Sequence, residues 1–199
     1  MSDDEGDASR PVRIPGQREL TATLDRPGGD ACVVACPPDP RMDGNRSDSR
    51  LTAVSDALGS TACLRFDYGP WAEAEGERED ALAAVRWAKE RYDRVGLFGY
   101  SFGGGIVLLA APEAEPDCVS ALAPASRLGD LDGAAAMERV DCPVQVVYGE
   151  RDTTAGWEPA VERARALGQE VVTMSADHFF VGQRKKVGRR VAEFLTAHL

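Results

Sequence analysis

Hydrophobic and polar positions follow two alternating patterns along this chain. Short runs of mostly apolar residues are typical of strands covered on both faces. They occupy residues 31–37, 61–69, 94–101, 118–125, 142–150 and 170–176. The intervening segments have apolar residues at helical spacing, which predicts amphipathic helices. These segments are residues 47–59, 75–92, 102–111, 158–168 and 185–199. The alternation predicts an α/β fold with a mostly parallel sheet and helices on both faces.

The first thirty residues have a different pattern. Residues 12–16 and 18–29 predict two short strands, the second closed by a Pro-Gly-Gly turn. Residues 1–11 are mainly acidic and polar, which predicts a disordered tail rather than a secretory signal. We therefore expect one α/β domain from residue 12 to residue 199.

A candidate nucleophile stands where one apolar run meets a helical pattern. The sequence GYSFG at residues 99–103 joins the predicted strand 94–101 to a predicted helix. Strand, Gly-x-Ser-x-Gly and helix together are the context of a nucleophile elbow, a strained turn that exposes a serine hydroxyl. Gly99 and Gly103 meet the need for small residues beside such a turn. Ser101 is the candidate nucleophile, and a glycine-rich turn without chemistry is the alternative.

A serine nucleophile needs a base, normally histidine. The chain has two histidines, and His178 follows the predicted strand 170–176 whereas His198 is the penultimate residue. Functional groups in parallel sheets gather at the carboxyl ends of strands, which favours His178. A structural histidine beside two phenylalanines is the alternative.

The base needs a carboxylate to fix its tautomer. Asp152 follows the predicted strand 142–150 and gives the order Ser, Asp, His of the fold in which this elbow occurs. Glu150 and Asp130 are competing carboxylates, and a surface aspartate that caps the next helix is the alternative for Asp152.

An oxyanion hole would pair the backbone N–H of Phe102 with one from the loop after residues 31–37. Three of the four residues 37–40 are prolines, which have no N–H, so Asp39 is the first available donor.

We expect Met42, Trp71 and Phe179 at the rim of the substrate pocket. Only 50 residues separate Ser101 from Asp152, and two predicted strands occupy part of them, so no lid domain fits.

Composition narrows the possible partners. Acidic residues number 33 against 23 basic ones, a net charge of −10, which excludes nucleic acid as the expected partner. An arginine-rich genome or adaptation to high salt would explain the acidity and the scarcity of lysine, and we favour salt adaptation.

No apolar stretch is long enough for a membrane span, and five scattered cysteines fit a reducing, cytoplasmic location. With two histidines and no CxxC pair, we expect no metal site.

The residues described above resemble those of the α/β-hydrolase superfamily and, within it, the small, lidless dienelactone-hydrolase-like proteins. Besides the elbow, "PPDPRMDGN" is similar to the family's His-Pro-His-Pro…Gly-Gly loop, and "LRFDYG" to its Arg-Phe-Asn-Tyr-Arg-Gly strand end. "GEREDALAAVRWA" is similar to its acidic helix start. The loop lacks the family's histidines, "PWAEAEGE" replaces its Arg-Gly-x-Gly-x-Ser stretch, and a serine stands where strict dienelactone hydrolases use cysteine.

The resemblance implies a serine hydrolase that acts without a cofactor on a small ester or thioester. Two other functions stay open at this stage. A binding or regulatory protein can keep the scaffold without the chemistry, and a peroxidase or lyase can use the same three residues.

Overall fold

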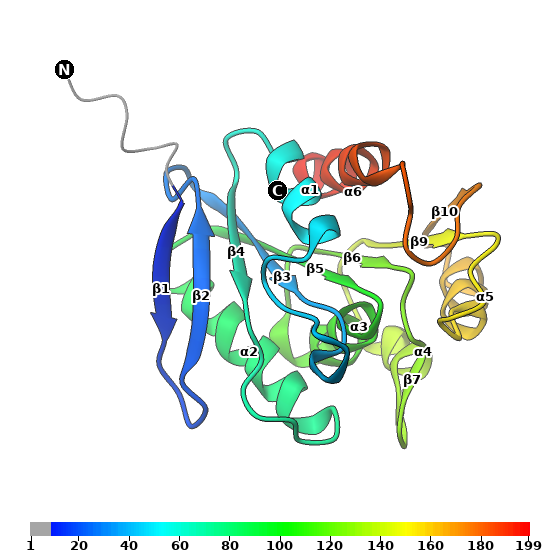
Figure 1. Ribbon diagram of the computed structural model, residues 1–199, viewed down its shortest axis with the longest axis horizontal. Coiled ribbons are helices and arrows are strands. Elements are labelled where there is room, and N and C mark those ends of the chain that lie inside the picture. The colour runs from blue at the N-terminus through cyan, green and yellow to red at the C-terminus, as the bar shows by residue number, and fades with distance from the viewer. Residues whose placement is uncertain (1–8) are drawn as a thin grey trace.

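The computed structural model describes residues 9–199, which form an eight-stranded sheet with helices on both faces (Figure 1). The strand order is β1-β2-β4-β3-β5-β6-β9-β10. The strands of this sheet are β1 (Arg10–Ile14), β2 (Leu20–Asp25), β3 (Ala31–Cys36), β4 (Ala62–Phe66), β5 (Arg94–Tyr100), β6 (Cys118–Leu122), β9 (Val144–Gly149) and β10 (Glu170–Met174). Strands β1 and β2 join the sheet antiparallel, and the remaining pairs are parallel. The predicted fold class is confirmed.

Each face of the sheet has its own hydrophobic core. The longer helices are α1 (Ser49–Ala57), α2 (Glu75–Lys89), α3 (Phe102–Ala114), α5 (Glu158–Ala166) and α6 (Arg184–His198). Helices α1 and α6 pack side by side on one face, and α2, α3 and α5 bury their apolar residues on the other (Figure 1). The central strands β4, β6 and β9 are buried at every position, as their continuous apolar runs predict.

The structure corrects the sequence-based elements at both edges of the sheet. Strand β1 begins at Arg10, so Arg10 and Pro11 pair with β2 instead of belonging to a tail. Residues 1–8 of that predicted tail lie outside the described residues. Strand β10 was predicted to be covered on both faces, but it is the last strand of the sheet and only Met174 in it is buried.

Between β6 and β9 the sequence left room for one ordinary helix. The chain forms instead the small hairpin β7 (Arg127–Leu128) and β8 (Leu131–Asp132), the short helix α4 (Gly133–Ala136) and the 3₁₀ turn η2 (Met137–Arg139). Asp132 accepts a hydrogen bond from the N–H of Ala135 and so caps α4. No lid domain is present among the described residues. None of the helices in residues 9–199 is both long and apolar enough to cross a membrane.

A buried ion pair joins the antiparallel hairpin to the rest of the sheet. Arg65 on β4 donates two hydrogen bonds to the Asp25 carboxylate, at 2.7 and 3.0 Å, and Ser55 and Ser9 donate one each at 2.6 Å. Burial by itself raises the pKa of Asp25, but the hydrogen bonds from Arg65, Ser55 and Ser9 outweigh it and lower the pKa below its usual value of 3.8.

We expect Asp25→Asn to lower the free energy of unfolding by about 3 kcal/mol at neutral pH, because it leaves the Arg65 charge buried without its partner. Urea denaturation measures the loss. Because the lowered pKa of Asp25 stabilises the native state only while the carboxylate is ionised, the difference from the native sequence narrows as pH falls below 3.8.

The control is Glu19→Gln, which breaks the exposed pair between Arg13 and Glu19. It should cost about 0.5 kcal/mol or less. Equal losses for the two variants would contradict a special role for the buried pair.

Candidate active site

Ser101 lies in a strained turn between β5 and α3. Its backbone φ of 58° and ψ of −117° fall outside the regions that L-residues favour. A Cβ atom at Gly99 would overlap the carbonyl of Gly103, and one at Gly103 would overlap the carbonyls of Cys36 and Pro37. The two glycines therefore allow the backbone to turn sharply and to touch the end of β3.

The structure brings together Ser101, His178 and Asp152, each from the carboxyl end of a different strand. His178 Nε2 lies 3.0 Å from Ser101 Oγ, and His178 Nδ1 lies 2.7 Å from Asp152 Oδ2. His178 and Asp152 are each only 5% exposed. Such an arrangement can activate the serine hydroxyl, because the base contacts both the nucleophile and an orienting carboxylate.

The carboxylate that contacts His178 is Asp152, and neither competing residue takes its place among the described hydrogen bonds. Asp152 also accepts hydrogen bonds from the N–H groups of Thr154 and Ala155, at 2.8 and 3.1 Å. These bonds fix the carboxylate in its loop. Glu150 is exposed, and Asp130 lies in the turn between β7 and β8.

The residues expected to form an oxyanion hole lie on two segments that touch. Phe102 is the first residue of α3, so its N–H has no partner within the helix. The close approach at Gly103 places Cys36 and Pro37, just before Asp39, against the start of this helix. The carboxylate of Asp39 is held in a salt bridge with Arg41 at 2.7 Å.

A pocket of about 610 Å³ adjoins the elbow at Phe102. It is lined by Arg41, Trp71, Glu73, Ala74, Glu75, Phe102, Arg127, Leu128, Gly129, Asp130 and Leu131. The Trp71 ring lies 5.7 Å from the Phe102 ring, and the Arg41 guanidinium covers Trp71 at 3.9 Å. The pocket therefore has an aromatic wall beside the serine and a mixture of charges around its mouth.

The three expected rim residues take different positions. Trp71 lines the pocket, and the Phe179 ring packs edge-on against His178 at 5.3 Å. Met42 is 80% exposed and does not line the pocket. The sequence placed Arg41 only among the residues next in line after Asp39 as backbone oxyanion donors. It did not predict Arg41 in the pocket lining, because stacking on Trp71 has no local sequence pattern.

Buried charges hold the loop that carries Trp71. Glu77 is fully buried and accepts hydrogen bonds from the N–H groups of Ala72 and Ala74 at 2.9 and 2.8 Å. Asp80 accepts one from the N–H of Gly69 at 2.9 Å, and burial raises the pKa of Asp80 to about 6. The sequence marked this acidic helix start only as a family similarity, because nothing local shows that the carboxylates point inward.

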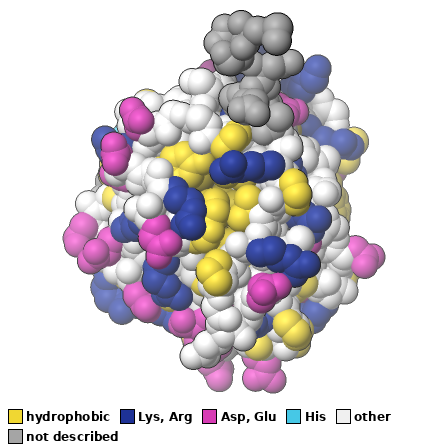
Figure 2. Space-filling model, turned by 90° about the vertical axis from the view of Figure 1, so that its left-hand side faces the viewer, with side chains coloured by type: hydrophobic (Ala, Val, Ile, Leu, Met, Phe, Trp, Pro, Cys, Tyr) yellow, Lys and Arg dark blue, Asp and Glu magenta, His cyan; other side chains and the backbone are white. Residues whose placement is uncertain are grey.

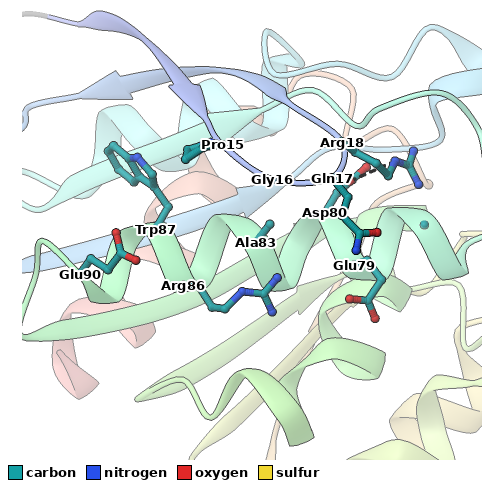
Figure 3. A pocket seen from close by; sticks show the side chains of 11 residues that line it. Pro15, Gly16, Gln17, Arg18, Glu79, Asp80, Ala83, Arg86, Trp87 and Glu90 are labelled. Atoms are coloured by element: carbon teal, nitrogen blue, oxygen red, sulfur yellow. Dashed lines mark ion pairs between the residues drawn. The ribbon is translucent and has the colours of Figure 1, made fainter.

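Arg18 completes this arrangement from the β1–β2 turn. Its guanidinium forms an ion pair with Asp80 at 3.3 Å (Figure 3). It also pairs with Glu77 at 3.6 Å and donates a hydrogen bond to the carbonyl of Pro70. A Cβ atom at Gly69 or at Gly76 would overlap this side chain. The loop therefore connects to the hairpin at the far edge of the sheet.

A second pocket, of about 590 Å³, lies on the outer side of Arg18 between the β1–β2 turn and α2 (Figure 3). In Figure 2, hydrophobic side chains gather near the centre of this face of the molecule and are bordered by Lys and Arg side chains. Ser101, Asp152 and His178 line neither of the two pockets. The pocket at Phe102 is lined by the residue that directly follows Ser101, so it is the candidate substrate pocket.

Comparisons with known proteins agree with this fold. The fold is that of the α/β hydrolases. The chain belongs to the dienelactone hydrolase family, whose model matches residues 68–184, more than half of the chain. Membership in this family confirms the predicted resemblance and supports a hydrolase.

Solved structures show the same fold at low identity. An α/β serine hydrolase without a lid from Xanthomonas campestris is 22% identical over 94% of this chain and 95% of its own, with a TM-score of 0.76. A dienelactone hydrolase from Anabaena variabilis is 20% identical over 98% and 100%, with a TM-score of 0.80. An esterase from Pyrococcus furiosus is 19% identical over 96% and 92%, with a TM-score of 0.83.

Among curated proteins, an uncharacterized 31.7 kDa protein of Escherichia coli is 35% identical over 65 residues. This match covers 26% of this chain and 23% of that protein. The chain thus matches less than a quarter of the length of this relative.

We expect Gly103→Ala to destabilise the protein strongly and to abolish any chemistry at Ser101, because the new methyl group would overlap two backbone carbonyls that cannot move independently. Thermal unfolding and soluble yield measure the effect. Gly156→Ala is the matched control, since a Cβ atom there meets nothing within 4 Å. A Gly103→Ala variant as stable as Gly156→Ala would contradict the packing argument.

Proposed function

We propose that this protein is a serine hydrolase that cleaves a small ester or thioester by acyl transfer. The observation that carries the proposal is the continuous hydrogen-bonded chain from Ser101 Oγ through the His178 imidazole to the Asp152 carboxylate. It supports catalysis over a binding role, because a protein that only binds ligand has no need for an oriented base beside a strained serine.

The mechanism follows from the roles of the two imidazole nitrogens. The Nδ1–H group of His178 donates a hydrogen bond to Asp152, which leaves Nε2 free to accept the proton of the Ser101 hydroxyl. The serine oxygen attacks the ester carbonyl, and the N–H of Phe102, with a second donor that we assign to Asp39, binds the oxyanion. His178 then protonates the departing alcohol or thiol.

Hydrolysis of the acyl-enzyme repeats these steps with water. His178 accepts a proton from the water, which attacks the acyl carbonyl, and returns it to Ser101 Oγ as the acid leaves. No step requires a cofactor. The same three residues could serve a lyase or a peroxidase, and product analysis after ester hydrolysis separates these reactions.

The pocket supports a small substrate. Its apolar wall consists of Trp71 and Phe102 together with two leucines from the β7–β8 segment, and charged residues complete the lining. Because each buried methylene contributes about 0.8 kcal/mol, a site with little apolar wall gains little from a long acyl chain.

We expect Ser101→Ala and His178→Ala each to lower kcat for ester hydrolysis by about 10⁴ to 10⁶, and the double variant to be little worse, because such residues act as a unit. Asp152→Asn should lower kcat by about 10⁴ while the fold is kept. Kinetics on purified protein with a soluble acetate ester measure these losses, with circular dichroism as the folding control.

Covalent labelling by a fluorophosphonate probe separates an enzyme from a binding protein on the same scaffold. The native sequence should be labelled at Ser101, and Ser101→Ala should not. A protein that resists the probe and hydrolyses no ester would overturn the proposal.

We expect kcat/KM to be highest for acyl chains of a few carbons and to fall for long chains, without activation at oil–water interfaces. A series of 4-nitrophenyl esters of graded chain length measures this. A kcat/KM that kept rising into long chains would reveal an apolar tunnel and contradict the small-substrate assignment.

A further inference from the structure

The hydroxyl groups of two tyrosines donate hydrogen bonds to backbone carbonyls near Ser101. Tyr100 Oη lies 3.1 Å from the carbonyl oxygen of His178, and Tyr68 Oη lies 3.2 Å from that of Pro37. We propose that Tyr100 and Tyr68 are positioning residues. Tyr100 holds the histidine loop, residues 175–183, and Tyr68 holds the oxyanion loop, which follows β3 and carries Asp39, each at a fixed distance from Ser101. The inference rests on the proposed function.

Tyr100 contacts the same residue as its neighbour Ser101. The serine hydroxyl lies 3.0 Å from the His178 imidazole, and the tyrosine hydroxyl lies 3.1 Å from the His178 carbonyl. The Tyr100 and His178 rings lie 5.4 Å apart at an interplanar angle of 30°. The dipeptide at the elbow therefore fixes His178 at both its side chain and its backbone.

The Tyr100 ring is also held by an arginine. The Arg50 guanidinium stacks over it at 4.5 Å, and Arg50 is itself paired with Asp48, the N-cap of α1, at 2.7 Å. Tyr100 is only 1% exposed, and burial raises the pKa of its phenol, so its hydroxyl stays protonated and able to donate.

The histidine loop needs an external support. Residues 175–183, between β10 and α6, have no regular secondary structure, and Phe180 within them has a left-handed φ of 50°. A displacement of His178 by a fraction of an ångström would lengthen its contact with Ser101, to which proton transfer is sensitive. The Tyr100 hydroxyl is the side-chain donor that holds the His178 carbonyl.

Tyr68 plays the corresponding role for the other loop. It follows β4, and its ring packs edge-on against the Phe102 ring at 5.7 Å and against the Phe66 ring at 5.3 Å. Its hydroxyl bonds to Pro37, two residues before the proposed donor Asp39. Tyr68 thus contacts Phe102, the first expected oxyanion donor, and Pro37 in the loop that carries the second, Asp39.

The test compares three Tyr→Phe variants, each of which removes one hydroxyl that donates to a backbone carbonyl. Tyr100→Phe and Tyr68→Phe are the test variants. Tyr92→Phe is the matched control, because the buried Tyr92 donates to the Pro27 carbonyl at 3.1 Å and lies outside the site. All three should lower the melting temperature to a similar extent, since each leaves one carbonyl without its donor.

We expect Tyr100→Phe and Tyr68→Phe each to lower kcat about ten-fold at an unchanged KM, and Tyr92→Phe to change kcat less than about two-fold. If kcat fell to the same extent in all three variants, as the melting temperature does, the two tyrosines would be structural residues and the proposal would be overturned.

A readout that needs no substrate keeps this inference separate from the proposed function. His198→Gln leaves His178 as the single histidine, so the proton that Nδ1 shares with Asp152 can be assigned in the proton NMR spectrum. In that background Tyr100→Phe should shift or broaden the resonance, and Tyr68→Phe and Tyr92→Phe should leave it unchanged. An unchanged resonance in Tyr100→Phe would overturn its role, whereas failure of the native sequence to cleave any ester would overturn the proposed function alone.

Discussion

The close approach of two backbones at Gly103 is the constraint on which the candidate site depends. Because no side chain separates them, the first turn of α3 lies against the carbonyls of Cys36 and Pro37. That contact fixes the distance between the serine turn and the loop expected to supply the second oxyanion donor. The same close packing continues at Gly104 and Gly105, which lie against the chain after β6. The glycine run therefore joins three neighbouring strands of the sheet around one serine.

The parts of the structure that the sequence predicted are those with local or periodic patterns. Continuous apolar runs placed the buried strands, and the elbow with its flanking strand and helix identified Ser101. The position of Asp152 after a strand was enough to rank it over Glu150. In the structure its carboxylate is hydrogen-bonded to the His178 imidazole.

The parts that the sequence did not predict depend on contacts between distant residues. Nothing near Arg18 indicates that its guanidinium fits over Gly69 and Gly76 and reaches Asp80, which lies 62 positions further along the chain. The β7–β8 hairpin was missed because its strands have two residues each, too few for an alternating pattern to appear. Met42 was expected at the rim from its loop alone, and only the fold shows that its side chain points to solvent.

A site without a lid must have its geometry in place before substrate arrives, since no closing movement can assemble it. The chain meets this requirement with hydrogen bonds from fixed side chains to the backbones of the site loops. Glu77 and Asp80 hold the loop of Trp71, and Tyr68 and Tyr100 hold the carbonyls of Pro37 and His178. Because these supports come from α2, from β5 and from the residues just after β4, all packed against the core, the cost of ordering the loops is met when the protein folds and not when it binds substrate.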